Sequence, residues 1–181
     1  QHQLRAEIAR GNVAAGVAAG AHFIATGYIT SRAMGGSGLH DLALAVAFFI
    51  IAQITLVLFV SLFRALTTYD DAEQIRGENL AAAVSYAGLA LAIAIVVGRA
   101  LDGDFTGWAS SLKGYAAVLA SGLALYPVRQ LFVQTFLLSG SITLRGGRID
   151  SGIAVEHDNG IAALEGATYI ATALALARLL G

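Results

Sequence analysis

Long apolar runs alternate with short polar segments along most of this 181-residue chain. Five runs are long enough to cross a lipid bilayer, which takes about 17–25 residues of helix. They cover residues 12–32, 42–63, 79–97, 111–138 and 160–180. The pattern predicts an all-α fold, a polytopic transmembrane helix bundle with five spans in a single transmembrane domain over 1–181. The polar segment 1–10 is expected to form either a tail or the loop after an upstream helix, and 67–78 and 139–158 are expected to form loops.

The five spans differ in side-chain size. The first, third and fifth are rich in Ala and Gly, which indicates helices that pack closely inside a bundle. The second and fourth carry bulkier side chains that suit contact with lipid. The second ends at Arg64, which we expect to reach the interface with its charged end. The fourth contains Pro127, the only proline, which predicts a kink because proline lacks the backbone N–H.

A polar motif precedes each Ala/Gly-rich span. Three asparagines align, each with an aliphatic residue four positions earlier and an alanine three positions later: Asn12, Asn79 and Asn159. An arginine follows about twenty positions on, at Arg32, Arg99 and Arg178. Three such matches predict an internal repeat. Repeat 1 covers about 5–66, repeat 2 about 70–138 and half repeat 3 about 153–181. The repeats are expected to be parallel, since the same motif starts each odd-numbered span.

Composition narrows the class of protein. The chain is 57% hydrophobic and 13% charged, and its mean hydropathy is +0.71, whereas soluble domains carry about 25% charged residues. We therefore expect an integral membrane protein with the lipid bilayer as its partner. The net charge of −1 argues against a nucleic-acid partner.

Reactive groups are sparse. The chain has no cysteine, and its four histidines show no metal-ligand spacing. No phosphate-binding loop, zinc helix or serine elbow is present in the sequence. We expect no catalytic residue, no metal and no cofactor.

The distribution of cations predicts the orientation. Six cations lie on the motif side of the spans and four on the other: Arg5, Arg10, Arg64, Arg76, Arg145 and Arg148, against Arg32, Arg99, Lys113 and Arg178. Positively charged loops stay in the cytoplasm. The excess predicts that the motif loops of this multi-pass protein lie in the cytoplasm.

The three asparagines allow two interpretations. An Asn at a helix start caps an unpaired backbone N–H, which is worth about 1 kcal/mol. Alternatively, Asn12, Asn79 and Asn159 form polar mouths that line a pore or an ion site.

Two charges fall well inside predicted spans, away from the span ends. Glu165 lies about 9 Å into the fifth span and Arg129 about 13 Å from the end of the fourth, on the same side of the membrane. Intramembrane charges are costly and find partners. We expect an Arg129–Glu165 ion pair, with Gln130 and Gln134 nearby. Its role is either structural or that of a transport or proton site.

The second motif resembles the bacterial membrane family known as domain of unknown function 350. The matching residues are Glu73, Ile75, Asn79, Ala81, Ala82 and Gly88, with weaker copies at Ile8, Asn12, Ala14 and Ala15 and at Val155, Asn159, Ala162 and Ala163. The third copy departs from the pattern at Ile161 and Glu165. The resemblance implies tandem two-helix repeats in a bacterial inner-membrane protein and brings no catalytic residues.

Two functions follow from these patterns. The first is a non-enzymatic membrane subunit that self-associates or joins another membrane subunit. The alternative is an ion channel or small-solute transporter that uses the Asn-capped helix mouths and the buried Arg129 and Glu165. The two differ in whether these groups face a common cavity or pair with each other.

Overall fold

The computed structural model describes residues 2–35, 38–143 and 145–180. Gln1, Gly36, Ser37, Leu144 and Gly181 lie outside the described residues, although the predicted domain and polar segments include them. Five helical segments are long and apolar enough to cross a membrane: α2 (Val13–Ala33), α3 (Leu39–Arg64), α5 (Leu80–Ala100), Trp108–Leu137 and α9 (Asn159–Leu179). The described residues form no strand. The all-α fold with five candidate spans is confirmed.

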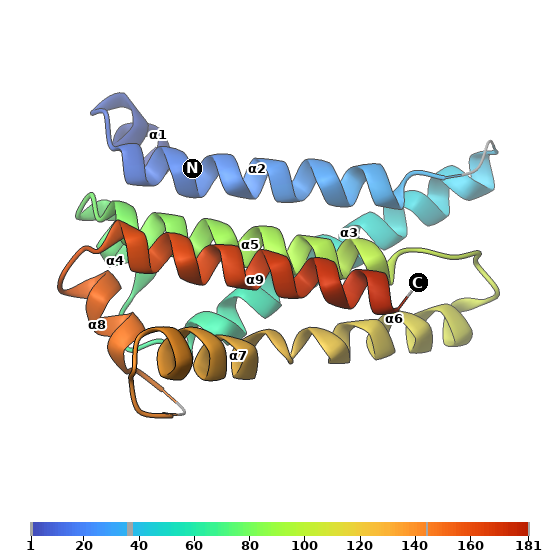
Figure 1. Cartoon of the computed structure of the whole chain (residues 1–181). Helices are drawn as coiled ribbons and strands as arrows, with labels where there is room; N and C mark the ends of the chain where they lie inside the picture. Colours follow the sequence, from blue (N-terminus) through green and yellow to red (C-terminus); the bar gives the residue numbers. More distant parts are fainter. Residues whose placement is uncertain (1, 36–37, 144, 181) are drawn as a thin grey trace.

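The Ala/Gly-rich helices α2, α5 and α9 run in the same direction, and α5 packs along both of the others. Figure 1 shows α3 and the Trp108–Leu137 segment returning in the opposite direction. At the crossing of α5 and α9, a Cβ added to Gly88 would overlap the Cα of Gly166. The two backbones therefore touch, as small residues permit inside a membrane. The central core contains Ala25, Ile29, Ala52, Leu56, Ile93 and Val97.

Three short helices occupy segments that the sequence suggested were tail or loop. They are α1 (His2–Ala9), α4 (Asp71–Arg76) and α8 (Arg148–Ala154). Each is followed by a residue with positive φ, and a long helix then begins: Gly11 before α2, Glu78 before α5 and His157 before α9. The loop prediction was therefore wrong for these segments. The sequence did not reveal the helices because each has only 6–8 residues, too few to show a long apolar pattern.

The fourth span consists of three segments, not one kinked helix. They are α6 (Trp108–Gly122), α7 (Leu125–Val128) and the π-helix η1 (Arg129–Leu137). The regular helix ends near Leu123, four residues before Pro127, because proline has no N–H to donate to that carbonyl. The π-helical turns place Arg129, Gln130, Val133 and Gln134 on the buried side.

We call the two ends of the bundle the motif end, with α1, α4 and α8, and the far end, with residues 101–107 and the last residues of α2 and α9. Figure 1 shows the motif end on the left and the far end on the right. All three Ala/Gly-rich helices start at the motif end. The candidate site lies at that end.

Candidate functional site

Asn12 and Asn79 lock the starts of α2 and α5. The Asn12 Oδ1 accepts from the Ala15 backbone N–H at 3.0 Å, and the Asn79 Oδ1 accepts from Ala82 N–H at 3.2 Å. Each side-chain amide also donates to a carbonyl of the following short helix: Asn12 to Ile75 at 2.9 Å, Asn79 to Ile153 at 2.8 Å. Both asparagines are buried. They cap α2 and α5 and link successive helix starts. Both the oxygen and the nitrogen of each side chain are occupied by these hydrogen bonds.

The third cap is Asp158 and not Asn159. The Asp158 Oδ1 accepts from Gly160 and Ile161 N–H groups at 2.8 and 3.0 Å, while Asn159 is the exposed first residue of α9. The shift arises in the preceding turn. Asp158 N–H donates to the carbonyl six residues earlier, whereas Asn12 and Asn79 donate to one five residues earlier. The predicted equivalence of Asn159 with the other two is therefore wrong by one residue.

Arg129 is fully buried between two carboxylates. Its Nε donates to the Glu165 Oε1 at 2.5 Å, and its Nη2 donates to the Asp150 Oδ1 at 2.5 Å. Arg129 and Glu165 are 0% exposed, and Asp150 is 1% exposed. The pair expected from the sequence is present, and a second acid from α8 joins it. The other Asp150 oxygen accepts from the Thr68 N–H at 2.8 Å, which ties α8 to the turn after α3.

The network continues from Glu165 across α5 to the end of α3. The Ser85 hydroxyl donates to the Glu165 Oε2 at 2.5 Å and accepts from the Arg64 Nη1 at 3.1 Å. Arg64 also pairs with both oxygens of Asp71 and donates to the Tyr69 hydroxyl at 2.8 Å. Arg64 is the last residue of α3, as the sequence predicted, but its side chain is only 9% exposed and makes its contacts inside the bundle. One chain of polar contacts thus links α3, α4, α5, η1, α8 and α9.

We call Arg64, Asp71, Ser85, Arg129, Asp150 and Glu165 the buried charge network. It contains two guanidinium groups and three carboxyl groups. Charges taken out of water lose several kcal/mol of hydration each, and paired geometry is needed to offset that loss. Most donors have partners, but the Arg129 Nη1 has none among the described residues.

Gln130 and Gln134 lie beside the network without joining it. Gln130 donates to the Tyr126 hydroxyl at 2.9 Å, and its Oε1 is buried without a partner among the described residues. Gln134 donates to the Ser141 carbonyl and the Thr143 hydroxyl, each at 2.9 Å. It therefore anchors the connection to α8. The sequence placed both near Arg129, but neither hydrogen-bonds to Arg129 or Glu165 within the described part of the chain.

Among the groups of the motif end that lie outside the spans, Asp71 and Tyr69 have raised pKa values. Burial raises the pKa of the Asp71 carboxyl, and the adjacent Arg64 guanidinium opposes that shift without cancelling it. Burial also raises the pKa of Tyr69 to about 12, again against the attraction of Arg64. Tyr69 therefore stays protonated at neutral pH.

A hollow of about 1000 Å³ reaches the outer edge of the network. It lies between α2, α3 and α4, with apolar walls from residues such as Ala18 and Val57 and a polar rim that includes Arg64 and Asp71. Arg129, Asp150 and Glu165 do not line it. The hollow meets only the Arg64 side of the network.

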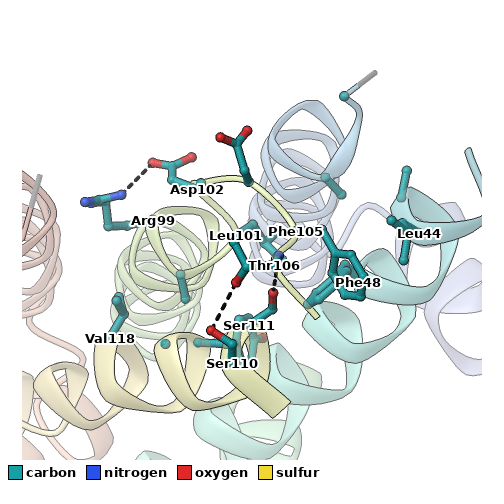
Figure 2. A pocket seen from close by; sticks show the side chains of 18 of the residues that line it. Leu44, Phe48, Arg99, Leu101, Asp102, Phe105, Thr106, Ser110, Ser111 and Val118 are labelled. Carbon is teal, nitrogen blue, oxygen red and sulfur yellow. Dashed lines mark hydrogen bonds and ion pairs between the residues drawn. The ribbon is translucent and has the colours of Figure 1, made fainter. Parts of the chain in front are cut away.

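A second hollow, of about 520 Å³, lies at the far end (Figure 2). Arg99 and Asp102 lie on one side of it, Phe48 and Phe105 on another, and the hydroxyls of α6 below. The two hollows share no lining residue. The core residues Ala52 and Leu56 of α3 are fully buried in the stretch between them. Neither hollow therefore extends from one end of the bundle to the other.

Sequence reasoning missed Ser85 and the three other charged members of the network. Those charged members are Arg64, Asp71 and Asp150. They occur at a span end or in polar segments, where charged residues are ordinary. No group of three or more His, Asp or Glu side chains among the described residues is placed to hold a metal ion.

The comparisons with known proteins give one match. The family described as Domain of Unknown Function (DUF350) matches residues 37–180, which is most of the chain and includes Arg64, Asn79, Arg129, Asp150 and Glu165. No curated protein and no solved structure matches. With five apolar helices of membrane-spanning length and this match, the chain is an integral membrane protein that belongs to the DUF350 family.

Proposed function

We propose that this protein is a non-enzymatic membrane subunit that self-associates or joins another membrane protein, with the buried charge network as a structural lock. One observation carries the proposal. Arg129, Asp150 and Glu165 pair with each other and are 0–1% exposed. A transport or catalytic site needs access from outside, and these three groups line neither hollow.

The lock also explains why the charges lie where they do. An intramembrane ion pair adds little net stability, because desolvation offsets the attraction, but a missing partner leaves a costly buried charge. Wrong packing of α9, η1 or α8 would separate Arg129 from Glu165 or Asp150. The network therefore favours one arrangement of these helices over others, which suits a scaffold.

A second candidate function is a conduit, an ion channel or small-solute transporter. The supporting observation is the hollow of about 1000 Å³, which brings Arg64 and Asp71 within reach of a ligand. The raised pKa of Asp71 makes it a carboxyl able to take up a proton more readily than usual. Against this candidate stand the packed core between the two hollows and the fully used side chains of Asn12 and Asn79.

We place the protein in a bacterial inner membrane with the motif end in the cytoplasm. The excess of arginines at the motif end supports this orientation. Reporter fusions at a motif-end loop and at a far-end loop test the orientation, and a far-end loop accessible only from the cytoplasm would reverse it.

Flux measurements test the structural role. Purified protein in liposomes is assayed for ion and proton flux, with Glu165→Gln and Asp71→Asn as variants and Glu156→Gln, an exposed carboxylate in a surface pair with Arg148, as the matched control. We expect wild-type flux at the level of protein-free liposomes. Flux that is present in the wild type and lost in Glu165→Gln or Asp71→Asn, but kept in Glu156→Gln, would establish the conduit instead.

A further inference from the structure

The helices α2, α5 and α9 can be compared position by position from their capping residues. The caps Asn12, Asn79 and Asp158 have the same backbone conformation, with ψ of 100°, 99° and 102°. An arginine follows each cap at the same distance, at Arg32, Arg99 and Arg178. The three helices therefore share one register. They form a row in which α5 lies between α2 and α9, so that α2 and α9 each pack along only one other helix of the row.

We call the side of α5 that meets α9 its forward face. Gly88, nine positions after the cap, touches the backbone of Gly166 in α9. The residues at 9, 13 and 17 positions after the cap are buried on α2 and α5 but exposed on α9. They are Ala21, Ala25 and Ile29, then Gly88, Ala92 and Val96, and finally Ala167, Ala171 and Ala175.

The opposite side, the rear face, shows the reverse. On α5 it meets α2, because a Cβ added to Gly98 would overlap the Tyr28 ring. The residues at 4, 8 and 15 positions after the cap are exposed or half-exposed on α2 and buried or half-buried on the other two helices. They are Gly16, Gly20 and Gly27, then Ala83, Ala87 and Ala94, and finally Ala162, Gly166 and Ala173. A Cβ at Gly16, Gly20 or Gly27 would meet nothing within 4 Å.

The arginines at the far end independently repeat this pattern. Arg32 of α2 pairs with Asp102, just after α5, and Arg99 of α5 donates to the Leu180 carbonyl, just after α9. Each arginine thus reaches the end of the next helix in the row. Arg178 of α9 is exposed and has no hydrogen bond or ion pair within residues 2–35, 38–143 and 145–180. The forward contact is missing where the row ends.

We propose that the row continues into a second copy of this chain, with the forward face of α9 packed on the rear face of α2 in that copy. Ala167 would then meet Gly20, as Gly88 meets Gly166 within one chain, and Arg178 would reach the end of α2. Because the two surfaces differ, the contact is head to tail and forms a ring or an open row, not a closed dimer. The inference rests on the proposed self-association and names its surface.

A second copy is the occupant that the faces favour. Within the chain, forward faces already meet rear faces twice, and the third pair of faces is again built from small residues that let helices approach in a membrane. One contact is not repeated: Asp158 has no side-chain N–H, so α9 lacks the bond that Asn12 and Asn79 make to the next short helix.

Cysteine cross-linking tests the interface directly, since the chain has no cysteine. The variants are Gly20→Cys, Ala167→Cys and the double variant, oxidised in membranes. The control double variant pairs Ala167→Cys with Leu58→Cys, an exposed position on α3. Helices that touch through small residues bring Cα atoms within the about 4.4–6.8 Å that a disulfide needs. We expect a ladder of dimers and higher species from the Gly20/Ala167 variant only. Dimers from Ala167→Cys alone, or no intermolecular product from the double variant, would overturn the interface.

A bulky substitution gives an independent readout. Gly20→Leu has room in the single chain, so the fold and its thermal midpoint should be kept while the mass in native lipid discs falls to that of one 18.6 kDa chain. Gly114→Leu on α6, another glycine with open space, is the matched control and should keep the wild-type mass. A wild type that is already a single chain would contradict self-association itself. A wild-type oligomer that Gly20→Leu leaves intact would contradict only this interface.

Discussion

The two ends of the helix bundle use the same chemical groups, arginines and carboxylates, in opposite surroundings. At the motif end, Arg129 and Glu165 are fully buried and join a network across six helices. At the far end, Arg32 and Asp102 form an ion pair, and their own side chains are 40% and 26% exposed. Water screens the second pair and not the first.

The contrast indicates what each end does. A complete buried ion pair changes the free energy of folding little, whereas a broken one is strongly destabilising. Buried pairs therefore favour one arrangement of the helices over others. Half-exposed pairs contribute about 0–1 kcal/mol and tolerate change. We infer that the motif end fixes how the helices are arranged and that the far end ties neighbouring helices only loosely.

The largest expected effect comes from removing one buried partner. Glu165→Ala leaves Arg129 with Asp150 alone and removes the acceptor of Ser85. We expect a loss of about 3–5 kcal/mol in the free energy of unfolding, measured by circular dichroism in detergent micelles. Glu156→Ala, which breaks an exposed pair with Arg148, should cost no more than about 1 kcal/mol. Equal losses would remove the distinction between buried and exposed pairs.

Asn79→Ala should have the next largest effect. It removes the cap of α5 and leaves the buried Ile153 carbonyl without its donor, with an expected loss of about 2 kcal/mol in the free energy of unfolding. Asn159→Ala tests the corrected register, since the exposed Asn159 is not the cap and its loss should be near zero. A cost at Asn159 similar to that at Asn79 would restore the original alignment.

A smaller effect is expected at the far end. Arg32→Gln breaks the pair with Asp102, and we expect a loss of about 0.2–1 kcal/mol in the free energy of unfolding, reduced further at high salt. The same denaturation experiment at low and high salt measures it. A loss above about 2 kcal/mol, independent of salt, would mean that the far end is as rigid as the motif end.

The smallest effect concerns pH at the surface of the motif end. The pKa of Glu7 lies below its ordinary value of 4.5, first because its carboxylate accepts from Asn12 and then because it accepts from Arg10. A lowered carboxyl pKa stabilises the fold above the unfolded value and loses that effect as the pH falls through the folded value. The thermal midpoint of the wild type should therefore fall slightly more than that of Glu7→Gln below about pH 4.5. Parallel curves for the two proteins would show that Glu7 contributes nothing.

The sequence predicted the spans because apolar runs of this length usually form transmembrane helices. It also predicted the Arg129–Glu165 contact, since a charge inside a span needs a partner and both residues lie at the same depth. Asp150 escaped prediction because its burial depends on α8 folding back against η1. A polar connecting segment such as 139–158 has no local sequence pattern that indicates such a contact.

Other differences have similarly local causes. Asn159 was misaligned because the turn before α9 holds one extra residue, which shifts the cap to Asp158. The π-helical turns after Pro127 were not predicted, because a proline indicates where a helix is interrupted but not how the chain continues. The internal repeat stays a prediction, which the shared cap conformation and the positions of Arg32, Arg99 and Arg178 support.

The most direct test of the central claim is a double-mutant cycle on Arg129 and Glu165, using Arg129→Met, Glu165→Leu and both together. The free energy of unfolding of each protein gives the coupling between the two side chains, and an identical cycle on Arg32 and Asp102 gives the far-end reference. We predict a coupling of about 2–3 kcal/mol for the buried pair and below about 1 kcal/mol for the exposed pair. Couplings of equal size would contradict the claim that the buried network locks the arrangement of the helices.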